Sequence, residues 1–137
     1  MSGNNVVKEK AEKFAVRIVK CSRYIRDSKR EYSLADQLLR SGTSIGANLG
    51  EAEFAQSKAD FISKLSIALK EAAETKFWLK LLHETDLLED KMFYSLSTDV
   101  KDIISLLVTI LRKLKGIDDI KKDQAPTMIH GLDNGRA

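Results

Sequence analysis

The sequence predicts an all-α fold, an antiparallel up-down four-helix bundle, and three observations support it. The 137 residues include one proline, Pro126, so little in the chain interrupts a helix. Apolar residues recur at alternating spacings of three and four over long segments, which is the pattern of bundle helices. Val, Ile and Thr never alternate with polar residues long enough to indicate a strand. The length suits one domain with a real core.

The same patterns divide the chain into four helices and a tail. We expect a four-helix bundle over residues 1–115, with helices at about 6–28, 33–55, 58–84 and 88–115. Gly116 is a signal for the end of the last helix. Residues 116–137, which mix Asp, Lys, Gly and the proline, are expected to form a flexible C-terminal tail.

The first helix should follow Asn5, a suitable N-cap, and it has a heptad seam. Its apolar residues are Val7, Ala11, Phe14, Ile18, Cys21 and Ile25. Ser33 and Asp36 then resemble a capping box at the start of the second helix.

Positive charge is concentrated in the first helix. The whole chain has a net charge of +3, whereas residues 1–31 alone contain nine Lys or Arg and four Asp or Glu. A charge run of this kind is either a solvated face or a phosphate-binding face. In the second case, the candidate nucleic-acid-binding residues are Lys10, Lys13, Arg17, Lys20, Arg23 and Arg26.

The second helix is unusual because it contains three glycines at intervals of four, Gly42, Gly46 and Gly50. Each costs a helix interior about 0.5–1 kcal/mol relative to alanine, so we expect the stripe to permit close approach of another helix. A polar line lies beside it: Ser41, Ser44, Asn48 and Glu51. This line forms a hydrogen-bonded network inside the bundle, a ligand or catalytic site, or a subunit contact. The candidate structural motif is Gly42, Ser44, Gly46, Asn48, Gly50 and Glu51.

The third and fourth helices also have heptad seams. Ser57 with Asp60 indicates the start of the third, whose small residues Ala68 and Ala72 are expected to lie against the glycines of the second. Its seam is Phe61, Leu65, Ala68, Ala72, Thr75, Leu79 and Leu82. The fourth has a second apolar face, so it lies in a broad core or contacts another subunit. Its seam is Phe93, Leu96, Val100, Ile103, Leu107, Ile110 and Leu114, and the second face is Ile104, Val108 and Leu111.

No pattern in the sequence indicates catalysis. No Glu stands three residues before a His, and one Cys with two His serves a zinc site poorly. Phosphate-binding and nucleophile motifs are also missing from the sequence. We therefore expect no catalytic residue, metal or cofactor, and no enzymatic activity; His83 is interpreted as a surface turn residue and Cys21 as a core residue. The lone cysteine and the lack of an apolar leader or membrane-length segment indicate a cytoplasmic protein without membrane contact.

Two motifs carry a family resemblance. The second helix has the pattern Ser-Ile-x-Ala-Asn-x-x-Glu, at Ser44, Ile45, Ala47, Asn48 and Glu51, and the third has Phe-x-x-x-Leu-x-Ile-Ala, at Phe61, Leu65, Ile67 and Ala68. With these motifs, residues 8–115 resemble the bacterial four-helix-bundle family of 23S rRNA intervening-sequence proteins. The chain departs from the family pattern at Gly46, where proline is frequent, and at Ala52, where glycine is common.

The resemblance implies a homopentamer, five bundles around a central channel, with no known enzymatic activity. The accessory proteins of diversity-generating retroelements are similar pentamers, implicated in binding nucleic acid and a reverse transcriptase. Our first hypothesis is a non-enzymatic oligomeric bundle that associates with nucleic acid, RNA or DNA, through its basic first helix. The alternative is a protein-interaction scaffold, or a retroelement accessory-like protein that binds a partner enzyme.

Overall fold

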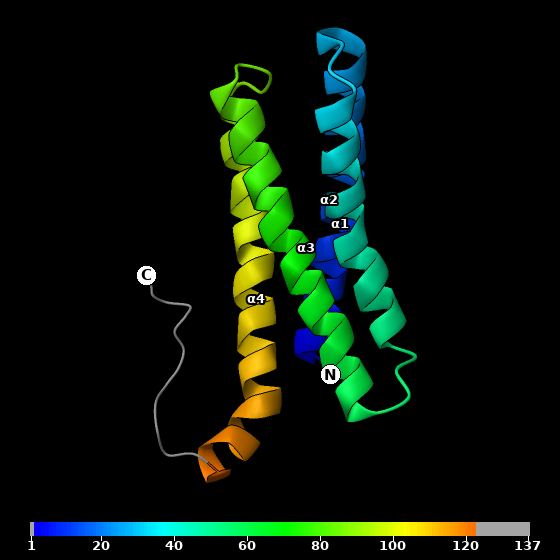
Figure 1. The fold of residues 1–137 in the computed structure, drawn as a ribbon, viewed down its shortest axis with the longest axis vertical. Helices are drawn as coiled ribbons and strands as arrows, with labels where there is room; N and C mark the ends of the chain where they lie inside the picture. The colour runs from blue at the N-terminus through cyan, green and yellow to red at the C-terminus, as the bar shows by residue number, and fades with distance from the viewer. Residues whose placement is uncertain (1, 123–137) are drawn as a thin grey trace.

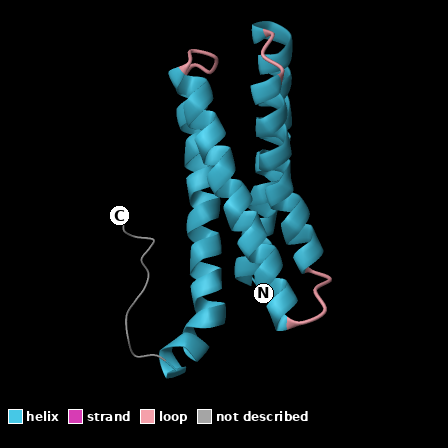
Figure 2. Ribbon diagram, viewed as in Figure 1, coloured by secondary structure: helices cyan, strands magenta, loops and turns pink. Residues whose placement is uncertain are grey.

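The computed structural model describes residues 2–122, and all of the regular structure in that part of the chain is α-helical. The four helices are α1 (Ser2–Lys29), α2 (Ser33–Ala52), α3 (Lys58–Glu84) and α4 (Asp90–Lys122). Short loops join them, as Figure 2 shows. The predicted all-α class and the number of helices are therefore confirmed. The flexible tail was predicted for residues 116–137, but residues 116–122 belong to α4. The rest of the predicted tail, residues 123–137, lies outside the described part.

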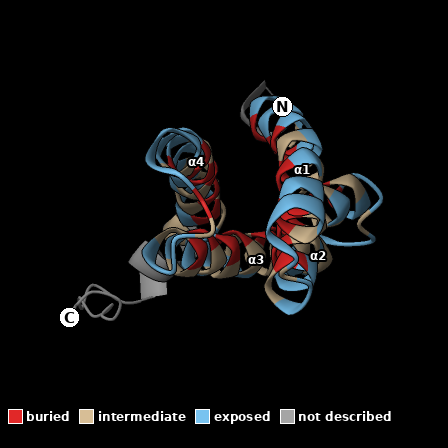
Figure 3. Ribbon diagram, turned by 90° about the horizontal axis from the view of Figure 1, so that it is seen from above, coloured by how far each residue is buried: buried red, intermediate tan, exposed pale blue. Residues whose placement is uncertain are grey.

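The heptad seams form the core. All six seam residues of α1 are buried, as are the seam residues of α3 from Leu65 to Leu82. Phe61 and three seam residues of α4, Phe93, Ile110 and Leu114, are only partly buried against this core. Figure 3 shows the buried residues on the inner sides of the helices.

The helices lie side by side in sequence order. Contacts join α1 to α2, α2 to α3 and α3 to α4, and α1 also contacts α4. The turn between α1 and α2 lies at the same end of the molecule as the loop between α3 and α4 (Figure 1). The loop between α2 and α3 lies at the opposite end. The result is a four-helix bundle in which α1 and α4 face one another.

Several helix ends differ from those predicted. The first helix begins at Ser2, upstream of Asn5, and α2 ends at Ala52, because residues 53–57 form a loop. Gly116 does not end α4, which continues to Lys122. No atom lies within 4 Å of a Cβ placed on Gly116 and its φ is not positive, so this glycine makes no turn.

Capping was predicted correctly at one site. The Ser57 side chain accepts a hydrogen bond from the Asp60 backbone N–H at 3.0 Å and so caps α3. At α2 the capping residue is not Ser33: Glu31 Oε2 accepts from the Leu34 N–H at 3.3 Å. Asp86 has a left-handed φ of 66° in the loop before α4.

No helix in the described part of the chain is both long and apolar enough to cross a lipid bilayer.

Candidate nucleic-acid interface

The six predicted cationic residues of α1 do not share one surface. Lys10, Lys13 and Arg17 line a small groove of about 260 Å³ between α1 and α4, together with the acidic residues Asp99 and Asp102. Arg26 instead contacts α2. Two of the six predicted cations, Arg17 and Arg26, therefore pair with acidic side chains of other helices.

Arg17 is engaged within the molecule. Its Nη1 donates to Asp99 Oδ2 at 2.5 Å, and its Nη2 donates to Ser95 Oγ at 2.8 Å. Both charged side chains are more than one-third exposed, so the pair contributes about 0–1 kcal/mol to stability. Its larger effect is on charge, because Asp99 neutralises Arg17.

Arg26 is engaged in a similar way at the other side of α1. Its Nη1 donates to Asp36 Oδ1 of α2 at 2.6 Å, and its Cζ lies 5.4 Å from the centroid of the Tyr32 ring. This contact explains why Asp36, which the sequence suggested as part of a cap, points to α1 instead.

The remaining predicted cations are exposed. Lys13 has only a long contact with Glu9, at 3.9 Å, and both side chains are largely in solvent. No ion pair in the described part of the chain involves Lys10, Lys20 or Arg23. These four remain candidates for phosphate contacts.

The structure adds residues that the sequence analysis did not select. Lys29 and Arg30 are exposed at the end of α1, and Lys29 lies over the half-exposed ring of Tyr24. The signal that could have found them was the density of charge near the end of the helix. Residues 20–30 contain five Lys or Arg and one Asp.

The glycine stripe of α2 contacts α1, not α3. A Cβ added to Gly42 would lie 2.7 Å from Ile18 Cγ2, and one added to Gly46 would lie 3.7 Å from the Ala11 carbonyl oxygen. Nothing lies within 4 Å of a Cβ on Gly50. Close packing was therefore predicted correctly at Gly42, but the alanines of α3 are not its partner.

The polar line beside the glycines is not one network. Ser44 Oγ donates to the Arg40 carbonyl oxygen and Asn48 Nδ2 to the Ser44 carbonyl oxygen, both within α2. Glu51 pairs with Lys64 at 3.3 Å. Only Ser41 enters the interior, where its Oγ lies 2.8 Å from Thr75 Oγ1 of α3.

A second polar cluster, which the sequence analysis missed, joins α2 to α3 at the surface. Arg40 pairs with Glu71 at 3.2 Å and also with Glu74. Trp78 Nε1 donates to Glu74 Oε2 at 3.0 Å. This cluster favours one register between α2 and α3, and it provides a hydrogen-bond acceptor for the Trp78 indole N–H.

The two residues considered for chemistry have structural roles. His83 is not a solvated turn residue: its ring lies in the last turn of α3, stacked on Phe93 at 4.0 Å, and its Nε2 is 2.7 Å from Asp90 Oδ1. Cys21 is buried, and this burial raises the pKa of its thiol to about 11. A thiol of this kind is a poor nucleophile at neutral pH.

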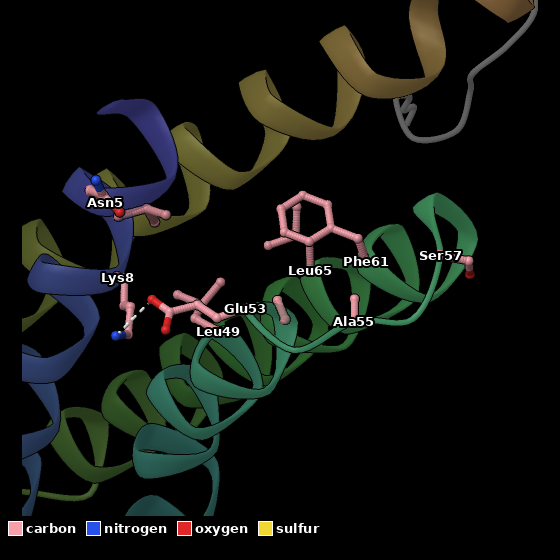
Figure 4. Close-up of a pocket in the computed structure, with 10 residues that line it drawn as sticks. Asn5, Lys8, Leu49, Glu53, Ala55, Ser57, Phe61 and Leu65 are labelled. Atoms are coloured by element: carbon pink, nitrogen blue, oxygen red, sulfur yellow. Dashed lines mark ion pairs between the residues drawn. The ribbon is translucent and has the colours of Figure 1, made fainter. Parts of the chain in front are cut away.

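A pocket of about 490 Å³ is lined by the start of α1, the end of α2, the α2–α3 loop and the start of α3. Leu49, Phe61 and Leu65 contribute apolar surface to it, and Lys8 pairs with Glu53 at 2.8 Å (Figure 4). Hydrogen bonding to Glu53 raises the pKa of Lys8. The described side chains contain no cluster of three metal-binding groups, here or elsewhere.

Comparison with known proteins adds a family and a structure. The family model described as 23S rRNA-intervening sequence protein matches residues 3–109. A crystal structure of a protein of unknown function from the S23 ribosomal protein family of Bacteroides thetaiotaomicron is 49% identical in sequence, with a TM-score of 0.79. The similarity covers 80% of this chain and 98% of that chain. No curated protein matches.

Proposed function

This chain belongs to the 23S rRNA-intervening sequence protein family, and from that premise we propose that it is a non-enzymatic, oligomeric bundle that associates with RNA through α1. The observation that carries the proposal is the charge of residues 20–30, with five Lys or Arg and one Asp. Four of the five cations, Lys20, Arg23, Lys29 and Arg30, are exposed.

The proposed mechanism is electrostatic. Exposed Lys and Arg side chains neutralise phosphates and release counterions, so binding weakens as the salt concentration rises. Contacts to phosphates position the nucleic acid without reading its sequence. Lys10, Lys13, Lys20 and Arg23 act directly in this proposal, whereas Arg17 and Arg26 are held by carboxylates of α4 and α2.

We also propose an antiparallel bundle that assembles as a cytoplasmic homopentamer. Support comes from α4, where Ile104, Leu106 and Ile110 are only partly buried within one chain. A ring of subunits would cover such apolar surface and repeat the cations of α1. Light scattering should give the mass of five subunits, and a monomer at micromolar concentration would contradict the assembly.

A mobility-shift titration with structured RNA and with DNA tests nucleic-acid binding. We expect a shift at low salt that is lost in the double variant Lys20→Glu, Arg23→Glu. The matched control is Lys70→Glu with Lys101→Glu, which reverses two exposed charges on α3 and α4. Failure of the unmodified protein to bind at low salt, or equal loss in both double variants, would overturn the proposal.

The second candidate function is a protein-interaction scaffold, including a retroelement accessory-like role with a partner enzyme. Exposed aromatic side chains favour it: Phe54 is 82% and Phe77 54% exposed. Purification with a stoichiometric protein partner that is lost after Phe54→Ser or Phe77→Ser, with no nucleic acid carried along, would support the scaffold over RNA binding.

A further inference from the structure

Two half-exposed tyrosines flank the turn between α1 and α2, and each has a cation over its ring. Tyr24 is 48% and Tyr32 49% exposed. Arg26 Cζ lies 5.4 Å from the centroid of Tyr32, and Lys29 Nζ lies 6.0 Å from the centroid of Tyr24. Exposed aromatic rings beside positive charge are the chemistry with which proteins hold unstacked bases.

The ring of Tyr32 is held in place by contacts between the two helices. Asp36 fixes the Arg26 guanidinium at 2.6 Å, and that guanidinium lies over Tyr32, the residue just before α2. A cation on one side of a ring restrains it and leaves its exposed part to a ligand. This contact favours one placement of the Tyr32 ring in the absence of a ligand.

Tyr24 lies at the edge of a groove. With Lys20, Cys21 and Met92 it lines a groove of about 410 Å³ between α1 and the start of α4. This groove adds apolar surface beside the ring, which suits the face of a base more than a phosphate.

Exposed cations lie close to both rings in the sequence, and one of them, Lys29, also lies over the Tyr24 ring in the fold. Arg23, Lys29 and Arg30 are all exposed in the last two turns of α1 and the turn after it. We call these three cations, with Tyr24, Arg26 and Tyr32, the turn patch. It combines phosphate-binding charge with stacking surface, whereas the cations at Lys10 and Lys13 have no exposed aromatic ring within the same turns.

Resting on the proposed RNA association, we propose that the turn patch binds single-stranded RNA, with unstacked bases on Tyr24 and Tyr32 and phosphates on Arg23, Lys29 and Arg30. In a duplex the faces of the bases are covered by their neighbours, so a duplex can use only the cations. The patch therefore discriminates by strandedness and not by sequence, because every base offers a π face.

Fluorescence anisotropy with the full chain tests this proposal. The probes are a labelled, unstructured single-stranded RNA and the duplex of that strand with its complement. We expect tighter binding of the single strand. Tyr24→Leu and Tyr32→Leu should each weaken it at least about fivefold, the low end for loss of one aromatic–base stack, and should leave duplex binding unchanged.

Three controls separate stacking from charge and from folding. Tyr24→Phe and Tyr32→Phe keep the ring and should keep the affinity. Tyr94→Leu removes an aromatic side chain that is 61% exposed on α4 and should have no effect. Circular dichroism melting shows whether each leucine variant folds.

The outcomes distinguish this inference from the proposed function. The stacking proposal is overturned if single strand and duplex bind with equal affinity, or if folded leucine variants bind the single strand as well as the unmodified protein does. In either case, loss of binding in the double variant Lys20→Glu, Arg23→Glu would still support the proposed RNA association. Failure of the unmodified protein to bind either RNA at low salt overturns both.

Discussion

The position that a Cβ of residue 42 would occupy lies 2.7 Å from Ile18 Cγ2, so Gly42 fixes how closely α2 approaches α1. Ile18 Cγ1 and Cβ are also within 3.2 Å of this position. Ile18 is fully buried and branched at Cβ, so it has little freedom to turn away. The two glycines that face α1 differ in this respect, since Gly46 would make only an ordinary contact with Ala11.

Gly42→Ala is expected to destabilise the protein although alanine is the better helix former. Overpacking against Ile18 costs about 1–3 kcal/mol, and the gain in helix propensity offsets about 1 kcal/mol of it. Gly50→Ala, with no atom within 4 Å of its Cβ, should instead stabilise the protein by about 0.5–1 kcal/mol. Urea denaturation measures both, and equal stabilisation by the two changes would contradict the close contact at Gly42.

The buried pair Ser41–Thr75 predicts an asymmetric effect of removing either hydroxyl. Thr75 Oγ1 lies 2.8 Å from Ser41 Oγ and 2.8 Å from the Glu71 carbonyl oxygen, whereas Ser41 has otherwise only a 3.4 Å contact to the Leu38 carbonyl oxygen. Thr75→Val should therefore cost about 1–2 kcal/mol, the cost of leaving a buried polar group poorly bonded. Ser41→Ala should cost less, because Thr75 keeps its bond to Glu71. In a double-mutant cycle by urea denaturation, a strictly additive result would show that the two hydroxyls do not interact.

Arg17 and Arg23 are expected to differ in RNA binding, although both belong to the predicted basic set. Arg17 is neutralised by Asp99, while Arg23 is exposed. Arg23→Ala should reduce the slope of log affinity against log salt concentration by about the contribution of one phosphate contact. Arg17→Ala should reduce this slope less. Asp99→Asn should strengthen binding, since it frees the Arg17 charge. Titrations at several salt concentrations give these slopes, and a larger effect of Arg17→Ala than of Arg23→Ala would show that Arg17 leaves Asp99 on binding.

The fold was predictable because its determinants are local. Heptad spacing alone identified the six core residues of α1, and Ser57 with Asp60 identified the start of α3. Local patterns could not predict which helix packs against which. The glycines of α2 would allow any helix to approach closely, and whether that helix is α1 or α3 depends on the side chains that face the glycines, such as Ile18. The predicted end of α4 was wrong because Gly116 lowers helix propensity but does not by itself terminate the helix.

The candidate interface was less predictable because charges act across the chain. Arg17 and Asp99 are 82 residues apart, so the sequence could not show that one neutralises the other. Arg26 and Asp36 are closer in the sequence, but they meet only because the turn between α1 and α2 places the two helices side by side. Tyr24 and Tyr32 become candidates for binding only through their exposure and the cations over their rings, which the sequence does not show.

The thiol of Cys21 predicts a loss of stability in alkali. Burial raises its pKa from 9.0 to about 11. Between these values the native state keeps its proton while the unfolded chain releases it, so the free energy of unfolding falls as pH rises through this range. The loss attributable to Cys21 is about 2–3 kcal/mol at 1.36 kcal/mol per pKa unit. Urea denaturation from pH 8 to pH 11 should show a steeper fall for the unmodified protein than for Cys21→Ala, and parallel curves would mean that the thiol ionises freely in the folded state.

Arg30 offers a test in which stability and binding change in opposite directions. It adopts a left-handed φ of 59° after α1, a conformation that costs a non-glycine residue roughly 1–2 kcal/mol. Arg30→Gly should remove that cost and, allowing for the greater freedom of unfolded glycine, stabilise the protein by about 1 kcal/mol. The same change removes an exposed cation of the turn patch and should weaken RNA binding. Asp86→Gly is the matched control, because Asp86 has a φ of 66° in the loop before α4; it should stabilise the protein without weakening binding. If Arg30→Gly raises stability and leaves RNA affinity unchanged, Arg30 makes no phosphate contact.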